Sequence, residues 1–258
     1  MSIVSAPEAP FSLAGELALI TGGGSGLGLG MAQCFVKSGA RVVLLSRDEG
    51  KLRAAVKQLG TQASYEVADL THLESARKAV ERISAREGPI SILINNAGNH
   101  LKKAAVDTSD SEFASILNTH VNAAFSLTRL VATGMIERQH GSILFIASMA
   151  ALIGVPLVAA YSAAKSAHLG LVRGLAAEWS ASGVRVNGIA PGWIDTDMVR
   201  AAVADDDDRK ARILNRTPMR RLGCLHDVGW AAVYLCSPAA AFVTATILPV
   251  DGGASIGF

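Results

Sequence analysis

Short, almost entirely apolar runs alternate with longer helix-like stretches along most of this 258-residue chain. The runs are LALI (17–20), RVVLLS (41–46), SYEVAD (64–69), SILINNAG (91–98), GSILFIAS (141–148), VRVNGIAP (184–191) and ATILPVDGG (245–253). Strands that are apolar throughout are buried on both faces, as in a parallel sheet between two layers of helices. The alternation therefore predicts one doubly wound α/β domain. Its parallel sheet has about seven strands with helices on both faces, and its ligand crevice lies at the carboxyl ends of the strands.

The helix-like stretches have apolar positions at helical spacing, and the longest span residues 49–59, 71–87, 111–138 and 161–181. We expect residues 1–11 to form a flexible N-terminal arm and residues 12–258 to form a single dinucleotide-binding and catalytic domain. The acidic run Asp205–Asp208 is expected to cap a helix that begins there, because carboxylates favour the positive end of a helix.

The composition excludes several classes of function. Half of the residues are apolar, 18% are charged and the net charge is +2, which gives no electrostatic case for binding nucleic acid or an anionic membrane. The most apolar stretch is interrupted by Gly154 and Pro156, and the N-terminus lacks the pattern of a signal peptide. Cys34, Cys224 and Cys236 have no metal-ligand spacing, so we expect reduced thiols, no metal site and a cytoplasmic protein.

A glycine-rich turn, TGGGSGLG, directly follows the first apolar run and opens the first helix-like stretch. Glycines permit a tight turn and a close backbone approach, and the start of a helix offers free amides to a phosphate. This placement predicts a dinucleotide site. The glycines are spaced as G-x-x-x-G-x-G at Gly22, Gly26 and Gly28, a different spacing from the usual G-x-G-x-x-G.

This glycine spacing is typical of one enzyme family, and further motifs follow it in order. They are NNAG (95–98), HVN (120–122), IAS (146–148), YSAAK (161–165), APGWIDTDM (190–198) and VDGG (250–253). Along essentially its whole length the chain resembles the short-chain dehydrogenases/reductases, whose domain is Rossmann-type. The resemblance implies an oxidoreductase that interconverts a ketone and a secondary alcohol by hydride transfer with a nicotinamide dinucleotide.

The resemblance also assigns four catalytic residues. Tyr161 matches the general acid/base, and Lys165, one helical turn on, would lower the pKa of its phenol. Ser148 matches the serine that hydrogen-bonds the reacting oxygen, and Asn122 matches the asparagine that holds a water in the proton path to the lysine.

A larger set matches the family's cofactor site. It comprises Thr21, Gly22, Ser25, Gly26, Leu27, Gly28, Ser46, Arg47, Asp69, Leu70, Asn96, Ala97, Gly98, Tyr161, Lys165, Pro191, Gly192, Ile194 and Thr196.

The choice between NADP and NAD depends on the end of the second strand. Ser46 and Arg47 stand where an NAD site carries a carboxylate, and a guanidinium suits a 2′-phosphate, so NADP(H) is preferred. Two observations oppose this. Ser25 replaces an arginine found in many NADP-dependent members, and Asp48 would bind an unphosphorylated ribose if the strand register slipped by two residues.

On the substrate side, the resemblance points to a mainly apolar pocket and to a lid over residues 198–222. The expected pocket residues are Asn99, His100, Ala150, Leu152, Val155 and Trp193. RTPMRRLG (216–223) and LPVDGG (248–253) look most like members acting on sugar acids or 3-oxoacyl thioesters, which leaves the substrate open. Family members are usually homotetramers or dimers. The alternatives are an NAD-dependent sugar-acid dehydrogenase of the same family and a nucleotide-sensing protein without turnover.

Overall fold

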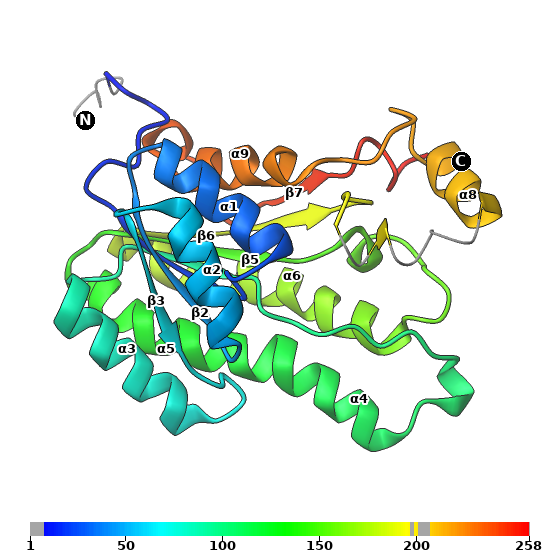
Figure 1. Ribbon diagram of the computed structural model, residues 1–258, viewed down its shortest axis with the longest axis horizontal. Coiled ribbons are helices and arrows are strands. Elements are labelled where there is room, and N and C mark those ends of the chain that lie inside the picture. The colour runs from blue at the N-terminus through cyan, green and yellow to red at the C-terminus, as the bar shows by residue number, and fades with distance from the viewer. Residues whose placement is uncertain (1–7, 197–198, 201–206, 258) are drawn as a thin grey trace.

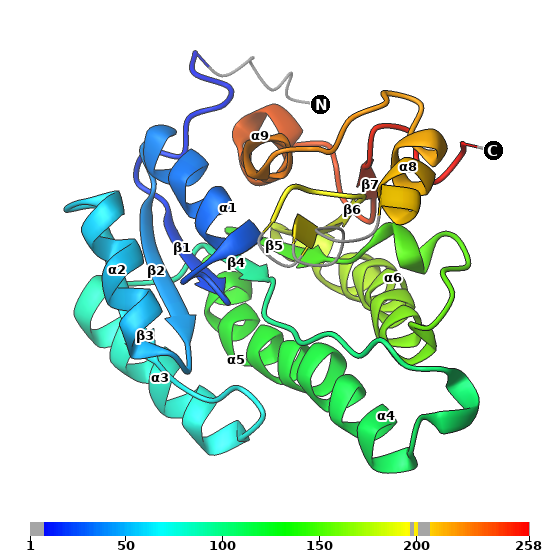
Figure 2. The same ribbon diagram turned by 45° about the vertical axis from the view of Figure 1, so that its right-hand side comes forward.

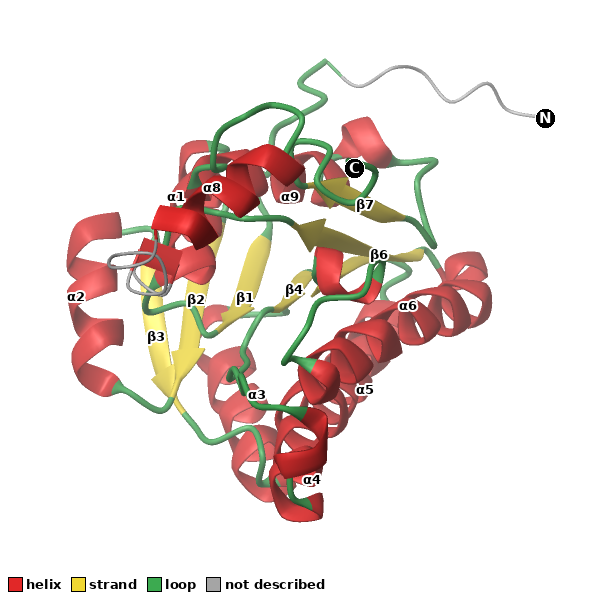
Figure 3. Cartoon of the chain, turned by 90° about the vertical axis from the view of Figure 1, so that its right-hand side faces the viewer, coloured by secondary structure: helices red, strands yellow, loops and turns green. Residues whose placement is uncertain are grey.

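The computed structural model describes residues 8–196, 199–200 and 207–257. Of the predicted N-terminal arm only residues 8–11 are described, and residues 198 and 201–206 of the predicted lid lie outside the described residues. The strands form one seven-stranded parallel sheet in the order β3-β2-β1-β4-β5-β6-β7, shown in yellow in Figure 3. They are β1 (Leu17–Thr21), β2 (Arg41–Ser46), β3 (Ala63–Val67), β4 (Ile92–Asn95), β5 (Gly141–Ile146), β6 (Val184–Pro191) and β7 (Ile247–Val250).

Helices cover both faces of this sheet (Figures 1 and 2). The main helices are α1 (Gly26–Lys37), α2 (Glu49–Leu59), α3 (Leu73–Glu87), α4 (Asp110–Leu117), α5 (Ala123–Glu137), α6 (Ala159–Trp179), α8 (Asp207–Arg216) and α9 (Leu225–Cys236). Buried side chains of α1, α2 and α9 form one hydrophobic core with the sheet, and those of α3, α5 and α6 form a second on its other face. The predicted doubly wound fold is confirmed.

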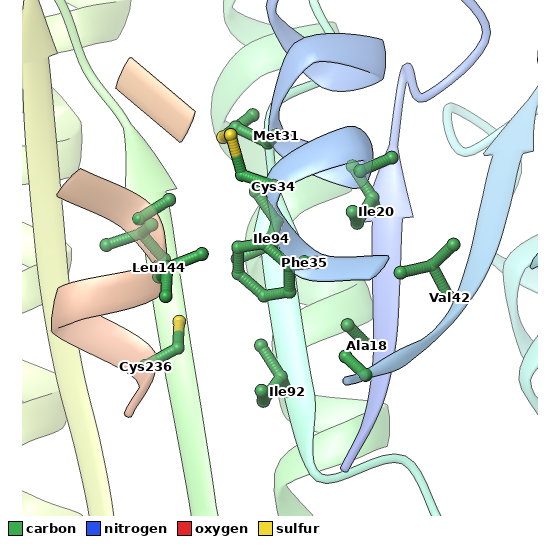
Figure 4. Close-up of a cluster of buried hydrophobic side chains, with 14 of the residues drawn as sticks. Ala18, Ile20, Met31, Cys34, Phe35, Val42, Ile92, Ile94, Leu144 and Cys236 are labelled. Atoms are coloured by element: carbon green, nitrogen blue, oxygen red, sulfur yellow. The ribbon is translucent and has the colours of Figure 1, made fainter. Parts of the chain in front are cut away.

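Strands β1, β2, β4, β5 and β6 supply both cores because successive side chains point to opposite faces. Ala18 and Ile20 of β1 belong to the core beneath α1, where they lie with Phe35 (Figure 4), whereas Leu17 and Leu19 belong to the other. Burying one such leucine or isoleucine side chain contributes about 1.5–3 kcal/mol. The strands are therefore apolar along their whole length, which is the pattern visible in the sequence.

Two details differ from the sequence expectation. The helix expected at 111–138 is divided into α4 and α5 by a single π-helical turn, Asn118–Asn122. Helix α9 was not anticipated; it packs on α1 at two glycines, since a Cβ at Gly30 would lie 2.6 Å from Leu225 and one at Gly229 would lie 2.5 Å from the Cys34 sulfur.

The fold directs the carboxyl ends of the strands to one edge. The strand order reverses between β1 and β4, and at such a switch point the connections diverge and leave a crevice. Asp207 and Asp208 lie in the first turn of α8, as expected for the acidic run, whereas Asp205 and Asp206 lie outside the described residues. In the part of the chain that the structure describes, no helix combines the length and apolarity needed to cross a bilayer.

Candidate active site

The glycine turn links β1 to α1 at the switch point. Gly22 and Gly26 have φ of 65° and 52°, which favour glycine, and a Cβ at Gly28 would overlap the carbonyl oxygen of Gly22. Ser25, the N-cap of α1, makes no side-chain cap bond, and the first turn of α1, which lies wholly within the described chain, carries no acidic residue. The first amides of α1 are thus left for an external anion, whereas Asp48 caps α2 and Ser109 caps α4.

Thr21 and Asn96 hold the turn against the end of β4. The Thr21 hydroxyl donates to the Ile94 carbonyl at 3.1 Å and accepts from the Asn96 and Ala97 amides at 2.9 Å each. The Asn96 side-chain amide donates to the Thr21 carbonyl at 2.9 Å. Thr21 is buried, and these bonds show that it positions the glycine turn.

Two adjoining hollows, of about 430 and 370 Å³, lie along the carboxyl edge of the sheet and share Gly22, Ala97, Gly98 and Asn99. Together they are lined by every residue of the predicted cofactor site except Thr21 and Gly28, both of which build the turn beneath them. The larger hollow contains Ser25, Gly26, Leu27, Asn96, Tyr161, Lys165, Pro191, Gly192, Ile194 and Thr196. The smaller contains Ser46, Arg47, Asp69 and Leu70.

Ser148, Tyr161 and Lys165 meet in the larger hollow. Tyr161 and Lys165 lie one turn apart on α6, and the Lys165 Nζ lies 5.6 Å from the centroid of the Tyr161 ring. Lys165 is 4% exposed, and its ammonium donates to the Ile146 carbonyl at 2.7 Å. Ser148 lies two residues after the end of β5, and its hydroxyl accepts a hydrogen bond from the Ala150 amide at 3.1 Å.

The pKa shifts correct one expectation. Lys165 was expected to lower the pKa of Tyr161, but burial raises the Tyr161 pKa and only a hydrogen bond with Ser148 opposes the rise. Burial also lowers the pKa of Lys165 to about 7. Both shifts have the same cause, since a buried site disfavours the phenolate and the ammonium alike.

Asn122, the fourth predicted catalytic residue, does not line the larger hollow. Asn122 is exposed, and its side-chain amide donates to the Asn118 Oδ1 at 3.4 Å. His120, two residues earlier, is 2% exposed and lines the larger hollow. Residues i and i+2 of a helix point in nearly opposite directions, so only one member of HVN can face the cleft. The HVN motif contains the residue that faces the cleft, but the sequence gives no signal for choosing between His120 and Asn122. The reason is that the π turn changes the helical phase.

Only some of the residues predicted for the substrate pocket line the larger hollow. Asn99 and His100 line the larger hollow, and the His100 ring lies 5.1 Å from that of Tyr161. Trp193 lines a neighbouring hollow with Met219, and Ala150 is buried. Of the six residues expected to form the substrate pocket, Asn99 and His100 therefore line this hollow, whereas Ala150, Leu152, Val155 and Trp193 do not line it.

At the far end of the smaller hollow, Arg47 lies 3.8 Å from Asp69. The pKa of Asp69 is lowered, chiefly by a hydrogen bond from the Thr71 side chain. Burial opposes this shift, and the positive charge of Arg47 adds to it. Asp48 accepts from the Lys51 amide at 3.0 Å as the cap of α2. Strand β2 ends at Ser46, so the register that would bring Asp48 to a ribose does not occur.

The three cysteines do not line either of the two hollows. Cys34 and Cys236 are buried, Cys224 is exposed, and all three are free thiols. Among residues 8–196, 199–200 and 207–257, no three His, Cys, Asp or Glu side chains are grouped as a metal site would require.

The comparisons with known proteins agree with this geometry. Residues 22–255 match a family model described as "Enoyl-(Acyl carrier protein) reductase". The chain is 39% identical over 246 residues to the 2-dehydro-3-deoxy-D-gluconate 5-dehydrogenase of Bacillus subtilis (strain 168), covering 94% of this chain and 96% of the relative. The chain belongs to the short-chain dehydrogenase/reductase family. It is an NAD(P)-dependent oxidoreductase of that family, acting on CH–OH and C=O groups.

Two more relatives of this short-chain dehydrogenase/reductase are similar over nearly the whole chain. The gluconate 5-dehydrogenase of Gluconobacter oxydans (strain 621H) is 37% identical over 249 residues, covering 95% of this chain and 97% of the relative. A solved gluconate 5-dehydrogenase from Burkholderia cenocepacia J2315, in complex with NADP and tartrate, superposes with a TM-score of 0.91 at 33% identity. That likeness covers 97% of this chain and 99% of the solved one.

Proposed function

We propose that this enzyme is an NADP(H)-dependent dehydrogenase that interconverts a secondary alcohol and a ketone on a small sugar acid. The observation that carries the proposal is the half-buried Tyr161 next to Ser148 and Lys165, in a cleft continuous with the uncapped N-terminus of α1. The bound dinucleotide would supply the hydride acceptor or donor.

In this proposal, Tyr161 is the general acid/base and Ser148 holds the reacting oxygen. The oxygen gains or loses a proton as hydride moves at the neighbouring carbon, so a phenol at that oxygen serves both directions. Lys165 supports Tyr161 and Ser148 from beneath the Tyr161 ring, where the Lys165 Nζ donates a hydrogen bond to the Ile146 carbonyl. A sensor without turnover would not need these groups in one cleft.

The preference for NADP(H) over NAD(H) rests on Ser46 and Arg47. Arg47 lies at the rim with 74% of its side chain exposed, so its guanidinium can turn to a 2′-phosphate. Both carboxylates that could bind a free ribose there are engaged elsewhere, Asp48 as a helix cap and Glu49 with Arg53 at 2.8 Å. The NADP in the Burkholderia cenocepacia relative supports the same choice.

A sugar acid is favoured because three relatives at 37–39% identity are gluconate 5-dehydrogenase or 2-dehydro-3-deoxy-D-gluconate 5-dehydrogenases, whereas one relative at 37% is a galactitol 2-dehydrogenase. The polar character of the cleft near Tyr161 fits such a substrate, since Asn99, His100 and Ser148 surround it. These side chains offer hydrogen bonds to hydroxyl groups, which an acyl chain does not need.

The decisive experiment is a substrate panel with the purified full-length chain. D-Gluconate and galactitol with NADP⁺ or NAD⁺, and 5-keto-D-gluconate and acetoacetyl-CoA with NADPH or NADH, are followed by nicotinamide absorbance. We expect turnover of gluconate and 5-ketogluconate with the phosphorylated cofactor. Turnover of acetoacetyl-CoA alone would contradict the sugar-acid substrate, and cofactor binding without turnover of any compound would favour the sensor.

The proposal extends to a cytoplasmic homotetramer, with a dimer as the alternative. Phe113 of α4 and Phe125 of α5 are 39% and 38% exposed, and β7 is an edge strand. Apolar surface of this kind is suited to burial against a second copy. Light scattering after size-exclusion chromatography measures the oligomeric state. For a protein of a reducing compartment, we expect three free thiols after non-reducing purification.

A further inference from the structure

One turn of the backbone contributes side chains to both hollows of the cleft. Asn118 and Thr119 line the smaller hollow, and His120 lines the larger one together with Tyr161. All three belong to the π turn Asn118–Asn122, which joins α4 to α5. The conformation of this turn therefore shapes the proposed cofactor site and the wall beside the phenol at the same time.

A π turn needs support from outside its own helix. The Ala123 amide bonds to the Asn118 carbonyl, whereas in an α-helix it would bond to the Thr119 carbonyl. The extra residue rotates the helix on one side of the turn by about 100° relative to a continuous α-helix. A continuous helix would present other side chains to the cleft, so tertiary contacts have to favour the π form.

His168 supplies such a contact at the centre of the turn. Its Nε2 lies 2.9 Å from the His120 carbonyl oxygen, and because a carbonyl oxygen only accepts, this nitrogen donates the hydrogen. His168 is 2% exposed and lies on α6 three residues after Lys165. Its ring lies against Phe145 of β5, with centroids 5.3 Å apart. The donor is therefore fixed by a long helix and by the sheet.

The His168 ring carries no charge that would change this contact at neutral pH. Burial, followed by the positive charge of Lys165, lowers the pKa of His168 to about 3. A neutral imidazole has one N–H, and here it is on Nε2, since Nδ1 has no hydrogen-bond partner among the described residues. The one hydrogen of the ring is thus committed to the His120 carbonyl.

His120 transmits this contact to the cleft. Its carbonyl is bonded to His168, while its ring Nε2 lies 2.7 Å from the Asn99 carbonyl oxygen. The same ring meets the Tyr161 ring edge-on, with centroids 5.5 Å apart and planes at 87°. A shift of the His120 backbone would therefore move the ring beside the phenol together with the side chains of the turn in the smaller hollow.

We propose that His168 is a positioning residue of this enzyme: its hydrogen bond to the His120 carbonyl holds the π turn in the register that gives both hollows their shape. His168 lines neither hollow and acts through the turn. The inference rests on the proposed function in one respect, which is that these hollows bind the dinucleotide and the substrate. It adds a residue outside the cleft on which both depend.

Two replacements of similar length isolate the hydrogen bond. Glutamine places its amide nitrogen at the position of the histidine Nε2 and keeps the donor, whereas methionine has no donor. We expect His168→Met to raise the Kd of NADPH in fluorescence titration by about three- to tenfold, the scale of one hydrogen bond, and to lower kcat with D-gluconate by a similar factor. His168→Gln should recover most of both losses. Wild-type Kd and kcat in His168→Met, or equal losses in both variants, would overturn the proposal.

A control variant separates positioning from a general loss of stability. Val131 of α5 is 5% exposed, belongs to the core on the face of the sheet that α3, α5 and α6 cover, and lines neither hollow. Val131→Ala should lower the midpoint of urea unfolding, as His168→Met does, and leave the Kd of NADPH and kcat unchanged at the same temperature. If Val131→Ala reproduces the functional losses of His168→Met, these losses reflect stability and the proposal is wrong.

Crystal structures of the two variants test the register itself. We expect the bond between the Ala123 amide and the Asn118 carbonyl to persist in His168→Gln. In His168→Met we expect this bond to be lost and the His120 ring to move away from Tyr161. An unchanged π turn in His168→Met excludes the proposal, whatever the kinetics show.

Cofactor binding distinguishes a failure of this inference from a failure of the proposed function. If the wild-type chain turns over no sugar acid while the Kd of NADPH still differs between His168→Met and His168→Gln, the proposed substrate is wrong and the role of His168 stands. If the wild type oxidises gluconate with NADP⁺ and His168→Met matches it in Kd and kcat, only the role of His168 is wrong.

Discussion

The Lys165 Nζ lies 5.6 Å from the centre of the Tyr161 ring and is held there by a 2.7 Å hydrogen bond to the Ile146 carbonyl. Ile146 is the last residue of β5, so the sheet itself aligns the ammonium with the phenol one helical turn before it. Tyr161→Phe keeps the ring and this alignment but removes the hydroxyl. We expect kcat to fall at least about a hundredfold, the range of general acid–base catalysis, with little change in the Kd of NADPH by fluorescence titration. Wild-type turnover in this variant would contradict the role of the phenol.

The pH dependence follows from burial, which lowers the pKa of Lys165 to about 7 and raises that of Tyr161. Oxidation of an alcohol adds one proton to the two groups together, so they must first have lost one, and Lys165 is the group with a pKa of about 7. We expect kcat for oxidation to rise about tenfold per pH unit below pH 7 and to level off above it, whereas reduction should weaken as pH rises. Lys165→Met should abolish the break near pH 7; a break that persists would assign it to another group.

The cofactor preference is tested at the end of β2. Arg47→Ala should lower kcat/KM for NADP⁺ by about tenfold or more and leave kcat/KM for NAD⁺ nearly unchanged, because charge-assisted bonds to a phosphate are lost. Asp48→Ala is the matched control: Asp48 caps α2, so we expect a lower midpoint in urea unfolding and an unchanged NADP/NAD ratio. An equal loss for both cofactors in Arg47→Ala would remove the case for phosphate recognition.

Gly98 is expected to be coupled to His120, because a Cβ at Gly98 would overlap the imidazole. Gly98→Ala should cost about 1–3 kcal/mol, as overpacking does. In the Gly98→Ala/His120→Ala double variant the ring is gone, so the two effects should not add in urea unfolding. Strict additivity would show that the ring and the glycine do not share this space.

Acid stability should depend on His120 and His168. Burial lowers their pKa values to about 4 and about 3, whereas an unfolded histidine titrates near about 6.5. Between these values the unfolded chain binds protons that the folded chain does not, so stability rises with pH in this window and falls on acidification. From pH 7 to 5 each histidine should cost about 2 kcal/mol of unfolding free energy. His168→Phe should lose about 1 kcal/mol at pH 7 with its hydrogen bond but fall less steeply toward pH 5 in urea titrations.

The sequence alone was sufficient to predict the sheet and the glycine turn, and Ser148, Tyr161 and Lys165 of the predicted catalytic set lie in one hollow. β2 and α2 have the predicted limits, Arg41–Ser46 and Glu49–Leu59, because local signals define them: an apolar run buried on both faces, then Asp48 as a helix cap. Tyr161 and Lys165 follow directly from a short motif on the regular helix α6, where spacing translates into position, and Ser148 follows β5 by two residues.

Only the tertiary structure decided which way side chains point where the backbone departs from a regular element, and how strongly they titrate. The π turn at Asn118–Asn122 shifts the helical phase, so His120 faces the cleft and Asn122 faces outward. Trp193 lies in the next hollow because long-range packing, not spacing, places the chain after β6. The pKa of Lys165 falls and that of Tyr161 rises because both lie beneath other segments, and desolvation depends on neighbours that are distant in the sequence.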